Sequence, residues 1–178
     1  MLVVDVSGSM QEDDKIGQAK QGLQVFLRQF SPRDRVGLLT FSSDASVLVP
    51  IATVARNRAI LRARVGELIA DGDTALYDAS SAGWEAVDRL RDDSRINAVV
   101  VLSDGEDTAS SSDLSDAVER FEARAKGEGR QIRVFTIAYG SSASKSVLED
   151  MAKASGGKAY EGDPDNIEAV YLQISSFF

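Results

Sequence analysis

Oxygen-bearing side chains follow the first apolar segment of the chain at alternating positions. Asp5, Ser7 and Ser9 come directly after the apolar residues 2–4. Successive side chains of an extended strand alternate in direction, so these three can point the same way at its end. One carboxylate and two hydroxyls are hard oxygen donors, which suit a small hard cation such as Mg²⁺. The spacing therefore predicts a divalent-metal site at the carboxyl end of this strand.

Two later segments supply further oxygen donors. Thr74 stands where a loop gives way to a predicted helix, and Asp104 comes just past a second wholly apolar strand. Residues that follow parallel strands meet at the carboxyl edge of the sheet. Capping and turn roles are the alternative interpretation. In it Ser7 and Ser9 cap the first helix, Thr74 caps the third, and Asp104 begins a plain turn.

Taken together, these segments resemble a known family. The Asp-x-Ser-x-Ser run, the later threonine and the later aspartate are similar to the metal-ion-dependent adhesion site of von Willebrand factor A-type domains, which include the integrin inserted domains. The resemblance covers the whole chain, and residues 174–178 also resemble the end of bacterial proteins that join a solute-binding domain to an A-type domain. It implies that five residues hold the metal: Asp5, Ser7, Ser9, Thr74 and Asp104.

The resemblance also implies the ion and the partner. The expected ion is Mg²⁺, with Mn²⁺ or Ca²⁺ as alternatives, because all three accept oxygen ligands. Asp5, Ser7 and Ser9 would hold it directly, Thr74 would complete its shell, and Asp104 would ligate it directly or through a water. The expected partner is a protein that presents an Asp or Glu oxygen to the metal. The predicted function is thus a metal-dependent, adhesion-type protein-binding module without enzyme activity.

Two other functions stay open. A scaffold or assembly subunit that works with an ATPase, as A-type domains of metal chelatases do, would use the same site. A magnesium-dependent hydrolase would use Asp5 as its nucleophile. Such enzymes usually carry a second acid two residues on, where this chain has Ser7. No Gly-x-Gly-x-x-Gly follows the first strand, which excludes a dinucleotide-binding fold.

Composition narrows the class of protein. The 178 residues, 43% hydrophobic and 27% charged, are typical of one globular domain. A net charge of −8 argues against a nucleic-acid partner, because phosphate binding needs a basic face. Histidine and cysteine are both absent, which removes the commonest general base and the usual zinc ligands. The sequence has no apolar run long enough to cross a membrane, so we expect no membrane insertion by this domain.

The chain starts inside its first strand. We therefore expect residues 1–178 to be a single A-type domain of a longer protein. If that protein is exported, an extracytoplasmic or cell-surface location is favoured over a cytoplasmic one.

Apolar strands alternate with amphipathic helices along the chain. This pattern predicts an α/β, doubly wound, Rossmann-like fold with a mostly parallel six-stranded sheet, one antiparallel edge strand and helices on both faces. Strands are predicted at 2–4, 36–41, 46–51, 96–102, 132–138 and 158–160. Helices are predicted at 13–29, 55–69, 75–91, 114–126, 144–154 and 164–176. The strands at 36–41 and 46–51 form the antiparallel hairpin, and Ile60, Leu61, Val65, Leu68 and Ile69 form the apolar stripe of the second helix.

Overall fold

A single six-stranded sheet forms the centre of the molecule. The computed structural model describes residues 1–125, 131–140 and 143–177. The strands are β1 (Leu2–Asp5), β2 (Arg35–Phe41), β3 (Ala45–Thr53), β4 (Asn97–Ser103), β5 (Ile132–Tyr139) and β6 (Ala159–Gly162). They lie in the order β3-β2-β1-β4-β5-β6, and each neighbouring pair is parallel except the β2–β3 hairpin. The predicted mixed sheet with one antiparallel edge strand is confirmed.

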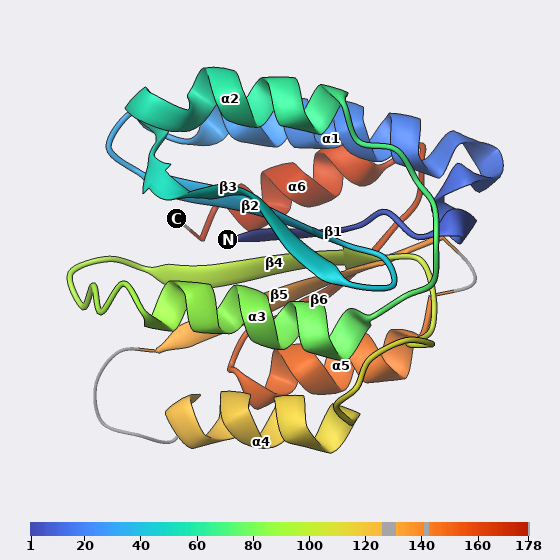
Figure 1. The fold of residues 1–178 in the computed structure, drawn as a ribbon. Helices are drawn as coiled ribbons and strands as arrows, with labels where there is room; N and C mark the ends of the chain where they lie inside the picture. Colours follow the sequence, from blue (N-terminus) through green and yellow to red (C-terminus); the bar gives the residue numbers. More distant parts are fainter. Residues whose placement is uncertain (126–130, 141–142, 178) are drawn as a thin grey trace.

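Helices cover both faces of the sheet (Figure 1). One face carries α1 (Lys15–Gln29), α2 (Val54–Gly66) and α6 (Ile167–Ser175). The other carries α3 (Leu76–Asp88), α4 (Leu114–Ala125) and α5 (Lys145–Ala154). Along β1, Leu2 and Val4 join the first core while Met1 and Val3 join the second. Burial on both faces explains why β1 and β4 read as continuous apolar runs.

The position of β1 in the sheet decides where a ligand site can form. It lies between β2 and β4, and the chain reaches β2 through α1 on one face and β4 through α3 on the other. This is a point where the strand order reverses, and open parallel sheets bind ligands at the carboxyl edge of such a point. Asp5 ends β1, and Asp104 follows the last residue of β4.

The beginning of the first helix differs from the prediction. A 3₁₀ segment, η1 (Gly8–Asp14), follows β1, and α1 begins at Lys15 rather than at residue 13. Asp13 and Asp14 have φ values of 49° and 53°, in the left-handed region, so the α-helix cannot include them. The reversal of the chain at these two residues sets the direction in which α1 leaves the site.

Three other helices also differ from the prediction. The second helix ends at Gly66, and two residues of its predicted apolar stripe are exposed, Ile60 by 51% and Ile69 by 81%. The third helix ends at Asp88 rather than at residue 91. The last helix begins at Ile167 rather than at residue 164, because the Asp163 carboxylate accepts hydrogen bonds from the two backbone N–H groups of residues 165–166 and holds a turn there. The fourth helix is Leu114–Ala125, and residue 126 of its predicted range lies outside the described residues.

Candidate metal centre

Asp5 is the most deeply held of the predicted site residues. Its side chain is buried, and one carboxylate oxygen accepts the Ser7 backbone N–H at 2.8 Å. The other oxygen accepts the Ser103 hydroxyl at 2.6 Å. Burial raises the pKa of Asp5; the Ser103 and Ser7 hydrogen bonds act in the opposite direction, and the nearby Asp104 carboxylate adds to the rise. Asp5 is thus oriented by its neighbours and disfavoured as a bare anion.

Two serines connect Asp5 to Asp104. The Ser7 and Ser9 hydroxyl oxygens lie 3.1 Å apart, and the Ser9 hydroxyl donates to Asp104 Oδ1 at 2.7 Å. Since Ser9 and Asp104 are 95 positions apart in sequence, the sheet topology is what brings them together. Four of the five predicted site residues therefore lie in one continuous set of contacts at the carboxyl edge of β1 and β4.

Thr74 lies beside these four residues, and its hydroxyl has no hydrogen bond to them. The residue is 5% exposed, its N–H donates to Thr108 Oγ1 at 3.0 Å, and its carbonyl accepts two backbone N–H groups. Within the described residues its own hydroxyl makes no hydrogen bond, and this oxygen is not among the fully buried atoms that lack a partner, so it stays open to a ligand or to solvent. A Cβ built on Gly105 would lie 3.7 Å from Thr74 Oγ1 and 3.8 Å from Ser9 Oγ. The two oxygens thus face a common space that the absent side chain of Gly105 leaves free.

The capping alternative does not describe these side chains. Ser7 is the N-cap residue of η1, but its side chain makes no capping hydrogen bond. The N-cap residue of α3 is Ala75, not Thr74. Asp104 is fully buried and accepts two side-chain donors, which is more than a plain turn requires. A capping or turn role therefore does not account for the side-chain contacts of Ser7, Thr74 and Asp104.

Lys15 is a member of the cluster that the sequence analysis missed. Its Nζ donates to Asp104 Oδ2 at 2.6 Å, and the two side chains are 7% and 0% exposed. Burial acts to lower the pKa of Lys15, but its hydrogen bond to Asp104 and the charges of Asp104 and Glu12 hold that pKa above its usual value. Tyr139 donates its hydroxyl to the Lys15 carbonyl at 3.1 Å, which fixes the first turn of α1. Ser103 was missed as well, and neither residue has a sequence pattern that marks it.

Comparison with known proteins identifies the family. The model of the von Willebrand factor type A domain matches residues 1–171. The chain belongs to this family.

Relatives of this A-type domain are parts of larger proteins. It is 29% identical to inter-alpha-trypsin inhibitor heavy chain H4 of Bos taurus, over 97% of this chain and 19% of that protein. It is 27% identical to calcium-activated chloride channel regulator 1 of Bos taurus, over 98% of this chain and again 19% of the relative. The chain thus spans about a fifth of the length of these curated relatives.

Solved structures support the fold of the A-type domain. A von Willebrand factor type A protein from Catenulispora acidiphila superimposes with a TM-score of 0.84 at 20% identity, over 98% of this chain and 41% of that one. The von Willebrand factor domain of the type V pili tip protein Mfa5 from Porphyromonas gingivalis gives a TM-score of 0.72 at 12% identity, over 99% and 93%.

The donor set of this A-type domain relies on hydroxyls. Within the described residues, no three His, Cys, Asp or Glu side chains lie close enough to form a metal cluster. The cluster has only two carboxylates, Asp5 and Asp104, and its other oxygens come from serine and threonine. A set of carboxylate and hydroxyl oxygens that includes the Thr74 hydroxyl beside Gly105 fits a small hard cation, since such ions accept neutral oxygens.

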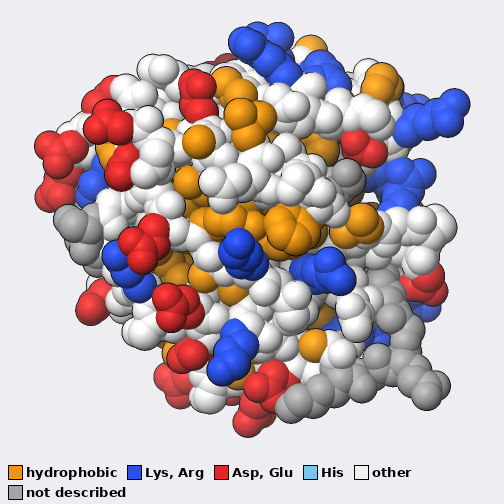
Figure 2. All heavy atoms as spheres, turned by 180° about the vertical axis from the view of Figure 1, so that it is seen from behind, with side chains coloured by type: hydrophobic (Ala, Val, Ile, Leu, Met, Phe, Trp, Pro, Cys, Tyr) orange, Lys and Arg blue, Asp and Glu red, His pale blue; other side chains and the backbone are white. Residues whose placement is uncertain are grey.

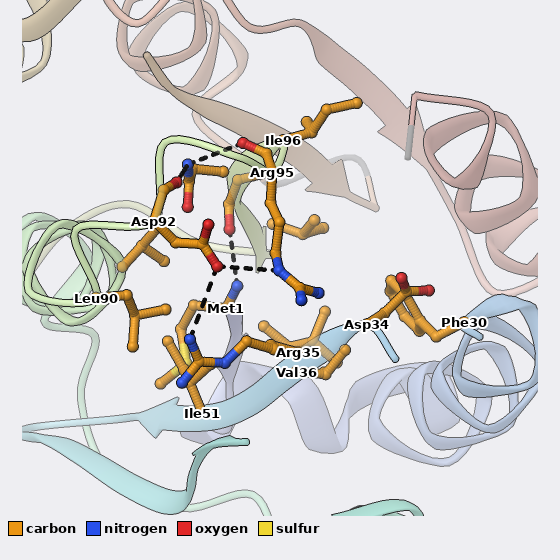
Figure 3. Close-up of a pocket in the computed structure, with 15 residues that line it drawn as sticks. Met1, Phe30, Asp34, Arg35, Val36, Ile51, Leu90, Asp92, Arg95 and Ile96 are labelled. Atoms are coloured by element: carbon orange, nitrogen blue, oxygen red, sulfur yellow. Dashed lines mark hydrogen bonds and ion pairs between the residues drawn. The ribbon is translucent and has the colours of Figure 1, made fainter. Parts of the chain in front are cut away.

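A separate cavity of about 230 Å³ lies at the opposite, amino edge of the sheet (Figure 3). Its lining includes Asp92, which pairs with Arg95 at 2.9 Å and with Arg35 at 3.8 Å. The Met1 amine, also at this cavity, donates to the Ala98 carbonyl at 2.7 Å. These charged groups pair with one another or with the backbone, so the cavity offers no convergent set of free polar groups comparable to the Asp5 cluster.

In the described parts of the chain, no helix has the length and apolar character to cross a membrane.

Proposed function

We propose that this A-type domain is a divalent-metal-dependent protein-binding module. Asp5, Ser7 and Ser9 would hold the ion, Thr74 would complete its shell, and Asp104 would ligate it directly or through a water. The observation that carries the proposal is the set of oxygens that the sheet topology brings to one place: the linked side chains of Asp5, Ser7, Ser9 and Asp104, with the Thr74 hydroxyl facing the same space beside Gly105. The Thr74 hydroxyl makes no hydrogen bond within the described residues, so its lone pairs are available to a small hard cation.

The charge of the cluster favours an acidic ligand. Asp5 and Asp104 contribute two negative charges and Lys15 one positive charge, which leaves −1 when both acids are ionised. A divalent cation brings this sum to +1. Mg²⁺ held mainly by neutral oxygens is a Lewis acid that accepts an anionic oxygen from outside. A carboxylate of a partner protein would therefore complete the charge balance, and no covalent step is needed.

The relatives agree with an interaction role. One is named as an inhibitor heavy chain and another as a channel regulator, and one structural neighbour is the domain of a pilus tip protein. We propose by analogy that this domain serves a longer protein that acts outside the cytoplasm or on the cell surface.

Calorimetry of metal binding tests the proposal. Mg²⁺, Mn²⁺ and Ca²⁺ would be titrated into wild type, Thr74→Val and Asp5→Asn. Thr53→Val, at the far end of β3, is the matched control for the loss of a hydroxyl. We expect Thr74→Val to weaken Mg²⁺ binding at least about tenfold, equivalent to about 1.4 kcal/mol, and Asp5→Asn to abolish it. Equal affinities in wild type and Thr74→Val would contradict the proposed role of this hydroxyl. Absence of metal binding in the wild type would refute the site.

A further inference from the structure

Exposed carboxylates surround the cluster on all the described loops that form it. They come from η1, from the β2–β3 turn, from the loop before α3 and from the loop after β4. The seven exposed acids are Glu12, Asp13, Asp14, Asp44, Asp71, Asp73 and Glu106, here called the acidic rim. Figure 2 shows the molecule from behind, and acidic side chains gather toward the left of that view. This is the end of the molecule where Figure 1 places η1 and the carboxyl ends of β1 and β4.

Backbone contacts hold the rim loops next to the cluster. The Gly8 N–H, between Ser7 and Ser9, donates to the Gly72 carbonyl at 2.9 Å, with Asp71 and Asp73 on either side of Gly72. Gly72 has a φ of +86°, and a Cβ built there would lie 3.0 Å from Ser43 Oγ, so the β2–β3 turn lies directly against this loop.

Two other rim acids lie close to Lys15 and Asp104. A Glu12 carboxylate oxygen lies 3.6 Å from Lys15 Nζ, which itself contacts Asp104. Glu106 is two residues beyond Asp104. The rim is therefore the immediate surface around the cluster rather than a distant acidic patch.

Basic residues do not balance this surface. The sequence segments 6–14, 42–44, 70–76 and 104–110 contain no lysine or arginine. Lys15 is buried, and its charge is already committed to Asp104. Lys145, at the start of α5, pairs with Glu161 at 2.7 Å. A partner that offered only a carboxylate would meet repulsion from the rim before it reached the cluster.

We propose that the partner segment carries one Asp or Glu flanked on both sides by lysine or arginine. The inference rests on the proposed metal-dependent function and specifies its ligand. Thr74, a residue 5% exposed whose hydroxyl makes no hydrogen bond within the described residues, marks the centre beside Asp5 and Asp104, where the acidic oxygen is needed. The exposed acids mark the periphery, where basic side chains form ion pairs. Each exposed pair contributes a factor of about two to five in affinity, so several together give about tenfold.

Three short peptides with blocked termini test the inference by calorimetry in Mg²⁺. The first has a central Glu flanked by lysines, the second the same Glu flanked by serines, and the third a central Gln flanked by lysines. Titrations at about 50 mM and about 500 mM NaCl separate screened from unscreened attraction. We expect the lysine-flanked Glu peptide to bind about tenfold more tightly than the serine-flanked one at low salt, and this advantage to fall to about twofold or less at high salt.

Two charge-matched variants assign the effect to the rim. The first carries Asp44→Asn, Asp73→Asn and Glu106→Gln, and should lose most of the preference for the lysine-flanked peptide. The control carries Glu119→Gln, Glu149→Gln and Asp150→Asn on exposed positions of α4 and α5, and should keep it. Thermal unfolding in chelator checks that both variants fold. An advantage that persists in the rim variant, or that the control variant also loses, would overturn the inference.

The remaining outcomes separate the inference from the function on which it rests. Equal binding of the two Glu peptides, with no binding of the Gln peptide, would overturn the inference and leave the metal-dependent function intact. Binding of the Gln peptide as tightly as of the lysine-flanked Glu peptide, with or without Mg²⁺, would refute the metal-dependent function. Absence of Mg²⁺-dependent binding by either Glu peptide would refute both.

Discussion

Replacing Lys15 by methionine tests the charge balance of the cluster directly. Lys15 Nζ lies 2.6 Å from Asp104 Oδ2, and the two side chains are 7% and 0% exposed. Methionine keeps most of the apolar stem and removes the charge, so Asp104 stays buried without its cation. Removal of one partner from a buried ion pair typically costs about 3–5 kcal/mol.

The expected change in melting temperature follows from the size of the domain. An unfolding entropy of about 2.1 cal/mol/K per residue gives about 0.37 kcal/mol/K for 178 residues. A loss of about 3–5 kcal/mol therefore lowers Tm by about 8–13 °C when no metal is present. In saturating Mg²⁺ the loss should be smaller, because the ion compensates part of the charge of Asp104. Mg²⁺ should also bind the variant at least about tenfold more tightly than wild type, since one positive charge beside it is gone.

The assay is thermal unfolding of wild type and variant in chelator and in Mg²⁺, with calorimetry for the affinity. Lys20→Met removes the same charge from the same helix and should change the free energy of unfolding by no more than about 0.5 kcal/mol. A Lys15→Met variant that melts in chelator at the same temperature as Lys20→Met would refute the ion-pair argument. A weaker Mg²⁺ affinity in Lys15→Met would show that Lys15 positions Asp104 rather than opposes the ion.

Other substitutions and conditions give further expectations. Gly105→Ala places a methyl group 3.7 Å from Thr74 Oγ1, an ordinary contact, so we expect a nearly unchanged Tm but at least about tenfold weaker Mg²⁺ binding by calorimetry. Because burial raises the pKa of Asp5 and the ion requires its carboxylate form, Mg²⁺ affinity should fall as the pH is lowered toward the folded-state pKa of Asp5, which lies above the ordinary value of an aspartate, with proton uptake by the free site; a pH-independent affinity would contradict this. The Asp78 carboxylate accepts four hydrogen bonds from Ser111 and Ser112, so Asp78→Asn should cost about 1.5–3 kcal/mol in urea unfolding near neutral pH. Burial acts to raise the pKa of Asp78, but these hydrogen bonds lower it below 3.8, so the difference from wild type should shrink as the pH falls below that value.

Most of the fold could be predicted because its sequence signals are local. Residues 2–4 of β1 and 98–102 of β4 are apolar without interruption, a pattern that burial on both faces of the sheet explains. Errors arose where apolar periodicity continued past a helix end. Ile69 has the spacing of a core residue, but α2 ends at Gly66 and leaves that side chain 81% exposed. The left-handed Asp13 and Asp14 have no pattern that distinguishes them from ordinary first-turn acids.

The candidate site was predicted as a set of oxygen donors, and its electrostatics were not. The alternating positions after the first strand identify Asp5, Ser7 and Ser9 as candidates. The position after an apolar strand identifies Asp104. Lys15 has no such signal, because a lysine at a helix start usually points to solvent. Its burial depends on Tyr139, the last residue of β5, and on Gly140, which follows that strand: a Cβ built on Gly140, at a φ of +84°, would lie 3.3 Å from Lys15 Cε. Such a contact follows from the assembled sheet and not from local sequence.

The central place of β1 also has a consequence for amide hydrogen exchange. Its backbone is paired on both sides, with β2 and β4, and covered on both faces, so its amides should exchange only through global unfolding. The loops at 71–75 and 105–110 are held by hydrogen bonds between loops rather than by a strand on each side, so their amides should exchange through local opening. Ligand binding should therefore slow exchange in these two loops and leave β1 almost unchanged. The cluster thus lies on a strand whose exchange does not change, between loops whose exchange does. Hydrogen–deuterium labelling of these loops would report occupancy of the site without any knowledge of the partner.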